Sequence, residues 1–204
     1  MGVAMTAERQ EQATPDTWMY PPEGGWTFDQ VKDLDLPFDW DLVDGNIVVR
    51  GMTALWHDLV RDGLYHRLRS VRRDPFAVNV ERCVLIDENN VQKPDVAVYD
   101  KRGLDVFTAE CVPVEQLALA VEVVSPGSRQ DDRVRKPAMF AAARVPHYWR
   151  VERGEDGLPV VYEFWYHHDA GVYAPSPEGA VHRGKLATEV PFPVTIDLHS
   201  LVEL

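Results

Sequence analysis

The chain has 204 residues, which is enough for one domain with a sizeable apolar core. Its 33 acidic residues outnumber its 21 lysines and arginines, and the formal charge of −12 argues against a general electrostatic attraction to nucleic acid or anionic lipid. No apolar run reaches the roughly eighteen residues of a membrane span, and the first residues lack the basic-then-apolar pattern of a secretory signal, so we expect a cytoplasmic protein without a membrane partner.

Two features of the chain are expected to carry no chemistry. Residues 1–17 are polar and aperiodic, which predicts a disordered tail before a single domain over residues 18–204. Cys83 and Cys111 are the only cysteines, and neither belongs to a Cys-x-x-Cys or His-rich pattern. We therefore expect two buried thiols, with neither a disulfide nor a structural zinc site.

The first half of the domain predicts a hairpin followed by a helix. Asp44-Gly45 separates two apolar-rich stretches, residues 40–43 and 46–49, and suits the positive φ angles of a tight turn. From residue 54 to about residue 71, leucines and valines recur at spacings of three to five. This spacing indicates an amphipathic helix that tolerates Gly63.

Three β-rich stretches follow, over residues 76–86, 96–99 and 117–124, and they predict consecutive strands. Ser128 with Asp131 three positions later resembles a capping box, and the apolar stripe after it predicts a second helix.

The second half of the domain predicts a parallel crossover and a hairpin. Pro137 cannot donate to the carbonyl of the preceding turn, so the second helix should kink or restart near Lys136. A strand over residues 147–151 follows this helix, and a strand–helix–strand order makes the sheet mixed. The remaining expected strands cover residues 160–165, 171–174 and 191–198.

Asp95 and Glu122 interrupt strands that are otherwise apolar. Removing an unpaired carboxylate from water costs several kcal/mol or raises its pKa until it neutralises, so something cationic should lie beside them. If the two strands are neighbours, same-face residues lie roughly 5 Å apart, and Mg²⁺ or Mn²⁺ with bonds of about 2.1 Å can bridge their oxygens. We predict a metal site here, with the ammonium of Lys136 orienting the attacking water or balancing charge.

Each of these three residues also has an ordinary structural interpretation. Asp95 can cap a backbone amide after Pro94, and Glu122 can belong to a buried ion pair with an Arg or Lys. Lys136 can form a helical pair with Asp132, four residues before it.

Further candidates are a histidine and two arginines. His57, on the first predicted helix, is a possible proton carrier, although a lone histidine there is more often a hydrogen-bonded packing residue. Arg129 and Arg133 can contribute to a local nucleic-acid-binding groove despite the overall acidity, whereas the arginines at 61–73 are equally consistent with a solvated helix face. Motifs of serine hydrolases, P-loop NTPases and zinc proteases are absent.

Pro94-Asp95, Glu122-Val123-Val124-Ser125-Pro126, Lys136 and the strand over residues 145–152 resemble the Uma-two family of restriction endonucleases, within the PD-(D/E)XK nuclease superfamily. The resemblance spans about residues 38–200. It implies an α/β fold with a restriction-endonuclease-like core, in which helices flank a central mixed β-sheet.

The resemblance also implies roles for individual residues. Asp95 and Glu122 become metal-binding acids, with the main-chain carbonyl of Val123 as an additional ligand. Lys136 supplies the lysine that the superfamily usually carries two positions after the second acid. Asp41 stands where the family commonly has a glutamate before the first hairpin turn, which makes Asp41 an accessory candidate.

The resulting hypothesis is an Mg²⁺- or Mn²⁺-dependent endonuclease that hydrolyses DNA phosphodiester bonds. One alternative is a catalytically silent module that keeps the scaffold and binds protein or nucleic acid. Another is a phosphoesterase acting on a small nucleotide or RNA, which the acidity fits because a small substrate needs no long basic surface. A homodimer is expected by analogy with enzymes that cut both strands of a duplex.

Overall fold

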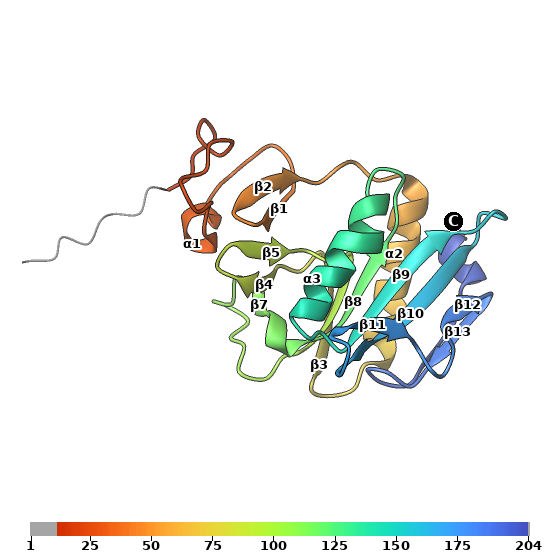
Figure 1. Ribbon diagram of the computed structural model, residues 1–204. Coiled ribbons are helices and arrows are strands. Elements are labelled where there is room, and N and C mark those ends of the chain that lie inside the picture. The colour runs from red at the N-terminus through yellow and green to blue at the C-terminus, as the bar shows by residue number, and fades with distance from the viewer. Residues whose placement is uncertain (1–11, 204) are drawn as a thin grey trace, which may run out of the picture. The chain divides into compact units, whose positions relative to one another are not determined.

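The computed structural model describes residues 12–203 as two compact units (Figure 1). One unit holds the described residues up to Arg50 together with Asp87–Gln92, and the other holds Gly51–Ile86 and the chain from Lys93 onward. Most of the expected tail, residues 1–11, lies outside the described residues. The part that is described contains a turn in which the Thr17 amide donates to the Thr14 carbonyl at 3.0 Å.

The first unit contains the expected hairpin. Its strands β1 (Trp40–Val43) and β2 (Asn46–Val49) pair antiparallel around Asp44-Gly45, whose φ angles of 47° and 71° are those of a tight turn. A short strand that the sequence did not predict, β5 (Asn90–Gln92), pairs with β1, and the short helix α1 spans Phe28–Val31.

The second unit begins with α2 (Leu55–Val71), which confirms the first predicted helix. Its apolar stripe, including Val60, Leu64 and Leu68, is fully buried in the core. Gly63 allows Leu201 to pack closely against this helix, since a Cβ atom there would lie 2.8 Å from Leu201 Cδ2. None of the described helices has the length and hydrophobicity that crossing a bilayer requires.

The second unit is built around a mixed sheet whose main path runs β11-β10-β9-β8-β6-β3, with β12 paired to β10. β8 and β9 are parallel neighbours, whereas the other pairs are antiparallel, so the predicted crossover is confirmed. The strands are β3 (Phe76–Val80), β6 (Val96–Asp100), β8 (Leu117–Val123), β9 (His147–Arg153), β10 (Pro159–His167), β11 (Val172–Pro175) and β12 (Val181–Arg183).

The two helices cover opposite faces of this sheet, with α3 (Lys136–Ala142) in front of the sheet and α2 behind it (Figure 1). Strand alternation sends Leu119 and Val121 of β8 into the cluster that contains the α2 side chains. Ala120 joins the other cluster, together with Phe140 of α3. Glu122 lies two residues after Ala120, so its side chain is on the same face of the sheet, the face that α3 covers.

The predicted strand over residues 76–86 is wrong as a single element. The chain turns at Glu81, where φ is 47°, and β4 (Val84–Asp87) then pairs in parallel with the short strand β7 (Val112–Pro113) instead of extending β3. The charged residues Glu81 and Arg82 mark the turn, but they also suit the exposed face of a continuous strand.

The expectation of two buried free thiols is also wrong. Cys83 and Cys111 form a disulfide, with Cα atoms 4.6 Å apart, and both are only half-buried. They precede Val84 and Val112, which are partners in the β4–β7 register. The cysteines are 28 positions apart, and the sequence does not show that they are neighbours because β7 is too short to be recognised.

The chain ends in a small antiparallel pair formed by β13 (Lys185–Thr188) and β14 (Val194–Asp197). β14 confirms the last predicted strand, and β10 with β11 confirms the predicted hairpin. Single turns of other helix types occur at η1 (Val114–Gln116), η2 (Asp131–Arg135) and η3 (His199–Val202).

Candidate active site

Lys136 lies between two buried carboxylates at one end of the sheet. Its Nζ atom is 2.8 Å from Glu122 Oε2 and 3.0 Å from Asp132 Oδ1. The lysine is 7% exposed, and both acids are 1% exposed. The sequence offered Asp132 as the structural partner of Lys136 and an unspecified Arg or Lys as that of Glu122, and the structure joins both acids to Lys136.

A change of helical register places Lys136 over the sheet. The helix begins just after Ser128 and widens into the π-helical turn η2, in which the Lys136 amide donates to the Asp131 carbonyl. In this register the next donor would be Pro137, which has no amide hydrogen to give to the Asp132 carbonyl. That carbonyl instead accepts a hydrogen bond from the Tyr148 hydroxyl at 2.7 Å. The expected restart near Lys136 is therefore confirmed.

Ser128 stabilises this turn differently from the predicted capping box. Its hydroxyl donates to the carboxylate of Asp132 rather than to a group on Asp131, whose own carboxylate pairs with Arg135 at 3.0 Å. The hydrogen bond from Ser128 holds the same acid that contacts Lys136. Asp132 thus connects the start of the helix, through Ser128, with the buried ion pair that it forms with Lys136.

Asp95 lies just before β6 and is 3% exposed. Its Oδ2 atom accepts the Val123 amide hydrogen at 2.7 Å and lies 3.2 Å from Nε2 of His57 in the first turn of α2. Because Val96 is opposite Val121 in the antiparallel β6–β8 register, one step further brings position 95 opposite Glu122. The two predicted acids therefore occupy neighbouring strands.

The two acids have opposite electrostatic environments. Burial raises the pKa of Glu122 well above its ordinary value, and the charge of Asp95 acts in the same direction, while Lys136 opposes both. Burial also acts to raise the pKa of Asp95, but the hydrogen bond and charge of His57, the charge of Lys136 and the Val123 amide outweigh it and lower the pKa. Asp95 is thus held as a carboxylate, whereas charge on Glu122 requires compensation.

Glu122 offers one oxygen to a further partner, because its buried Oε1 atom accepts no hydrogen bond within the described residues. Carboxylate oxygens suit Mg²⁺ or Mn²⁺, and Mg²⁺ usually binds one or two protein carboxylates and keeps several waters. Within residues 12–203, no group of three or more His, Cys, Asp or Glu side chains is arranged to hold a metal. Asp95 and Glu122 would offer a cation oxygen donors only, which are the donors found in Mg²⁺ and Mn²⁺ sites.

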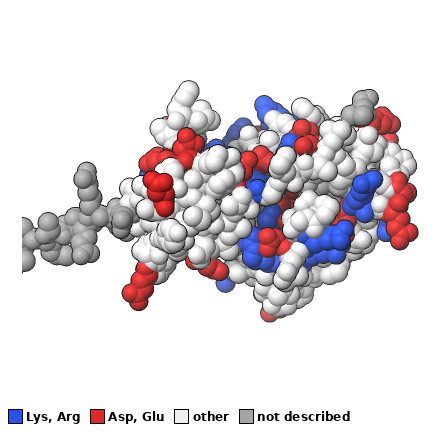
Figure 2. Space-filling model, turned by 90° about the horizontal axis from the view of Figure 1, so that it is seen from above, with Lys and Arg blue, Asp and Glu red and all other residues white. Residues whose placement is uncertain are grey.

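The remaining predicted site residues are distributed over both units. Asp41 belongs to β1 of the first unit, where its side chain is buried, and its accessory role stays a prediction. His57, Arg129 and Arg133 line a hollow of about 290 Å³ in the second unit. On the face drawn in Figure 2, Lys and Arg side chains gather in one region among Asp and Glu side chains.

Sequence reasoning missed three residues of this hollow. Trp56 looks like a core residue of an amphipathic helix, and Glu152 and Arg153 look like ordinary residues at a strand end. Arg133 is not simply available to a ligand, because its guanidinium forms a two-pronged ion pair with Glu152. No spacing rule links positions 133 and 152, which meet only through the parallel β8–β9 crossover.

Comparisons with known proteins identify a family and a shared fold. Residues 28–181 match the model of the Uma2 family, described as "Putative restriction endonuclease". The crystal structure of a protein from Anabaena variabilis, described as a putative nuclease belonging to DUF820, superposes with a TM-score of 0.64 at 14% identity. The match covers 86% of this chain and 96% of that one, which shows a shared mixed α/β fold with a restriction-endonuclease-like core. No curated protein sequence matches this chain.

Proposed function

We propose that this chain, which belongs to the Uma2 family described as "Putative restriction endonuclease", is a nuclease that hydrolyses DNA phosphodiester bonds with Mg²⁺ or Mn²⁺. The observation that carries the proposal is that Asp95 and Glu122 are both buried and influence each other's pKa, with Lys136 hydrogen-bonded to Glu122 and Glu122 Oε1 without a hydrogen bond in the described chain. A buried carboxylate oxygen without a hydrogen bond destabilises the folded protein, so its presence calls for an explanation, which a functional role would supply.

The side chains of Asp95 and Glu122 would hold the ion, and the family resemblance adds the carbonyl of Val123. The Val123 amide and His57 fix the orientation of Asp95, and Lys136 fixes that of Glu122. A bound divalent ion supplies Lewis acidity that polarises a phosphoryl group and makes a water nucleophile available at neutral pH.

Lys136 contributes positive charge close to both acids. Its ammonium donates to Glu122 and is in contact with Asp132, so it is held in position by two carboxylates. From this position it stabilises the negative charge that develops on a phosphoryl group in the transition state. Arg129, on the wall of the adjoining hollow, would bind a neighbouring phosphate of the substrate.

The test is a nicking and linearisation assay on supercoiled DNA with Mg²⁺, Mn²⁺ or EDTA. Asp95→Asn and Glu122→Gln should each lower the cleavage rate by at least about a hundredfold, as should Lys136→Ala. Glu163→Gln removes an equally buried carboxylate outside the site and serves as the matched control. Cutting in EDTA, or full activity of either acid variant, would reject the proposal.

A catalytically silent module is the second candidate, and one observation favours it. Lys136 already contacts Glu122 and Asp132, so an ion pair accounts for part of the burial of these acids without a metal ion. Calorimetry with Mn²⁺ separates the candidates, because an enzyme should bind the ion and lose it on Glu122→Gln. Duplex DNA, RNA and mononucleotide substrates compared in the same assay test the phosphoesterase alternative, and sedimentation with and without DNA tests the homodimer.

A further inference from the structure

The hollow beside the acids forms a groove that we call the arginine groove. It has a volume of about 290 Å³ and lies where the first turn of α2, the segment after β8 and the end of β9 come together. His57 forms part of its wall and lies 3.2 Å from Asp95, so the groove adjoins the candidate metal site. The side chains used below are Trp56, Arg129, Arg133, Glu152 and Arg153.

The charge of this groove is opposite to that of the chain as a whole. Three guanidinium groups face it against the single carboxylate of Glu152, although the chain carries a formal charge of −12. In the part of the chain that the structure describes, neither Arg129 nor Arg153 forms an ion pair. Two arginines without carboxylate partners beside a pair of buried acids indicate an anionic ligand.

Glu152 occupies the position of an anion within the groove. Its Oε1 atom lies 3.1 Å from Nε of Arg133 and 2.8 Å from Nε of Arg150, and its Oε2 atom accepts from a second nitrogen of Arg133. This two-pronged geometry is the one that guanidinium groups also use to bind phosphate. Glu152 therefore competes with a phosphate for Arg133.

Trp56 gives the groove an aromatic surface. Its indole N–H donates to the Gly157 carbonyl at 2.8 Å, so the polar edge of the ring is already satisfied by the protein. The side chain is only partly buried. Proteins that bind single-stranded nucleic acids combine aromatic rings, on which the bases stack, with cationic side chains that contact the backbone. The groove combines these two kinds of side chain.

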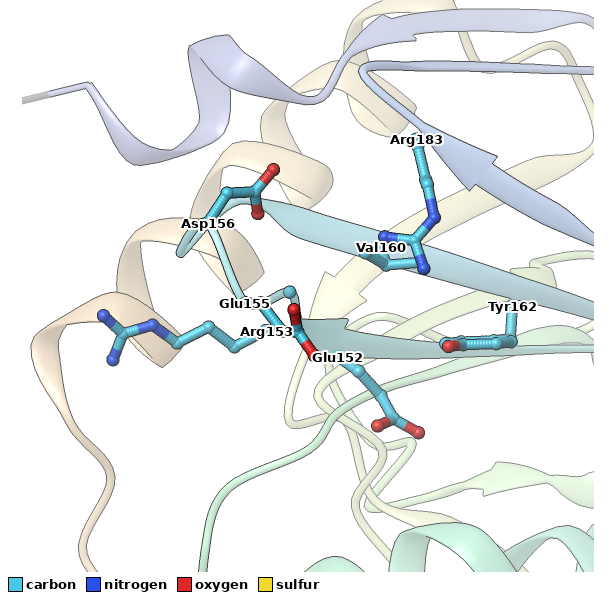
Figure 3. Close-up of a pocket in the computed structure, with 8 residues that line it drawn as sticks. Glu152, Arg153, Glu155, Asp156, Val160, Tyr162 and Arg183 are labelled. Atoms are coloured by element: carbon cyan, nitrogen blue, oxygen red, sulfur yellow. The ribbon is translucent and has the colours of Figure 1, made fainter.

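A second hollow continues from the arginine groove. It has a volume of about 530 Å³, and Glu152, Arg153 and Gly154 line both. Figure 3 shows Arg183 of β12 extending toward Tyr162 of β10 within it, while Arg153 and Glu152 leave the end of β9 in different directions. Together the two hollows provide a path with cationic groups at intervals.

We infer that this path binds an unpaired DNA strand, with Arg129 and Arg153 on its phosphates, and that Glu152 limits the affinity by holding Arg133. The inference rests on the proposed nuclease function and specifies its substrate. Each hollow falls within or near the roughly 300–1,000 Å³ of small-ligand pockets, which suits one or two nucleotides and not the width of a duplex. An acidic protein also lacks the extended basic surface that duplex binding uses.

The experiment measures binding separately from cleavage. Fluorescence anisotropy with a labelled twelve-nucleotide strand is recorded in EDTA, with the full chain, and compared with the duplex and the RNA of the same sequence. The single strand of DNA should bind at least about tenfold more tightly than the duplex. Arg129→Gln and Arg153→Gln should each weaken binding roughly three- to tenfold and reduce the salt dependence by about 0.7 per phosphate contact.

Glu152→Gln provides the decisive variant, because it removes the negative charge and the Oε2 acceptor that hold Arg133 and should strengthen binding roughly three- to tenfold. Glutamine keeps the Oε1 acceptor that contacts Arg150, which protects the fold. Arg69→Gln, at an exposed position of α2, is the matched control and should leave binding unchanged.

Three results would overturn the inference: equal or tighter binding of the duplex or the RNA, unchanged affinity of the Arg129 and Arg153 variants, or weaker binding by Glu152→Gln. These failures are distinguishable from failure of the proposed function. Preferential single-strand binding without metal-dependent cutting would reject only the nuclease activity. Metal-dependent cutting without single-strand preference would reject only the substrate assigned here.

Discussion

Replacing Lys136 by methionine tests the electrostatics of the buried site directly. Methionine keeps the length of the side chain but removes the ammonium that contacts Glu122 at 2.8 Å and Asp132 at 3.0 Å. Breaking a buried ion pair by removing one partner typically costs about 3–5 kcal/mol, because the remaining charge is left uncompensated. For a chain of this size, that corresponds to a decrease of roughly 6–20 °C in Tm.

The assay is urea unfolding followed by circular dichroism, carried out as a double-mutant cycle. Glu122→Gln combined with Lys136→Met should lose less than the sum of the single changes, with a coupling of about 0.5–3 kcal/mol, because glutamine does not need the cation. Lys101→Met is the matched control. Lys101 pairs with Asp74 at 2.8 Å, but both side chains are more than half exposed, so its loss should stay within about 0.5 kcal/mol.

Mn²⁺ adds a second measurement to the same experiment. If Asp95 and Glu122 hold the ion, Mn²⁺ at about 100 times its Kd should stabilise the wild-type chain by about 2.7 kcal/mol, and Glu122→Gln should remove most of that gain. A Lys136→Met variant as stable as Lys101→Met would refute the assignment of a charge-compensated buried site. Purely additive losses in the cycle would refute the direct coupling of Glu122 to Lys136.

Three further outcomes are expected. Gly45→Ala should destabilise the first unit by about 1–3 kcal/mol in thermal unfolding, because φ is 71° there and a Cβ atom would lie 2.5 Å from Gly25 Cα; an unchanged Tm would contradict this. Cys83→Ser should cost about 2–4 kcal/mol, and thiol titration of the denatured wild-type chain should find reactive cysteines only after reduction. Burial lowers the pKa of His147 from the ordinary 6.5, although the charge of Glu163 acts in the opposite direction. The unfolded chain therefore binds the proton more readily, and the free energy of unfolding should decrease as the pH falls from about 7 to 5. His147→Phe should flatten this decrease, and stability–pH curves of equal slope for the wild type and the variant would contradict the explanation.

The elements that the sequence predicted well are those with a strong local signal. Asp44-Gly45 specifies its own turn, and the leucine spacing of α2 specifies a buried stripe whatever it packs against. The π-helical restart at Lys136 was also predictable, because Pro137 removes a hydrogen-bond donor in any context. Local chemistry alone fixes these features.

The elements that the sequence did not predict depend on contacts between distant segments. The turn at Glu81 places the second half of the predicted strand over residues 76–86 in another sheet, and the β4–β7 pairing then brings Cys83 to Cys111. The ion pair between Arg133 and Glu152 likewise depends on the β8–β9 crossover, which brings these two distant residues together. The pairing of Lys136 with Asp132 could be proposed from their spacing on one helix, whereas the pairs that join different elements could not.

The arrangement of donors around the two acids argues for a site that was not shaped by stability alone. Asp95 accepts a hydrogen bond from the backbone and lies beside His57, and both stabilise its charge. Glu122 has Lys136 on one oxygen, while the other is buried without a hydrogen bond in the described chain, at a cost of about 1–3 kcal/mol. An apolar residue at position 122 would avoid this cost and continue the valine-rich strand, and buried ion pairs replaced by apolar residues are often as stable or more so. A carboxylate with one unbonded oxygen at the end of β8, beside Asp95, supports the proposed metal site, in which that oxygen would bind the ion.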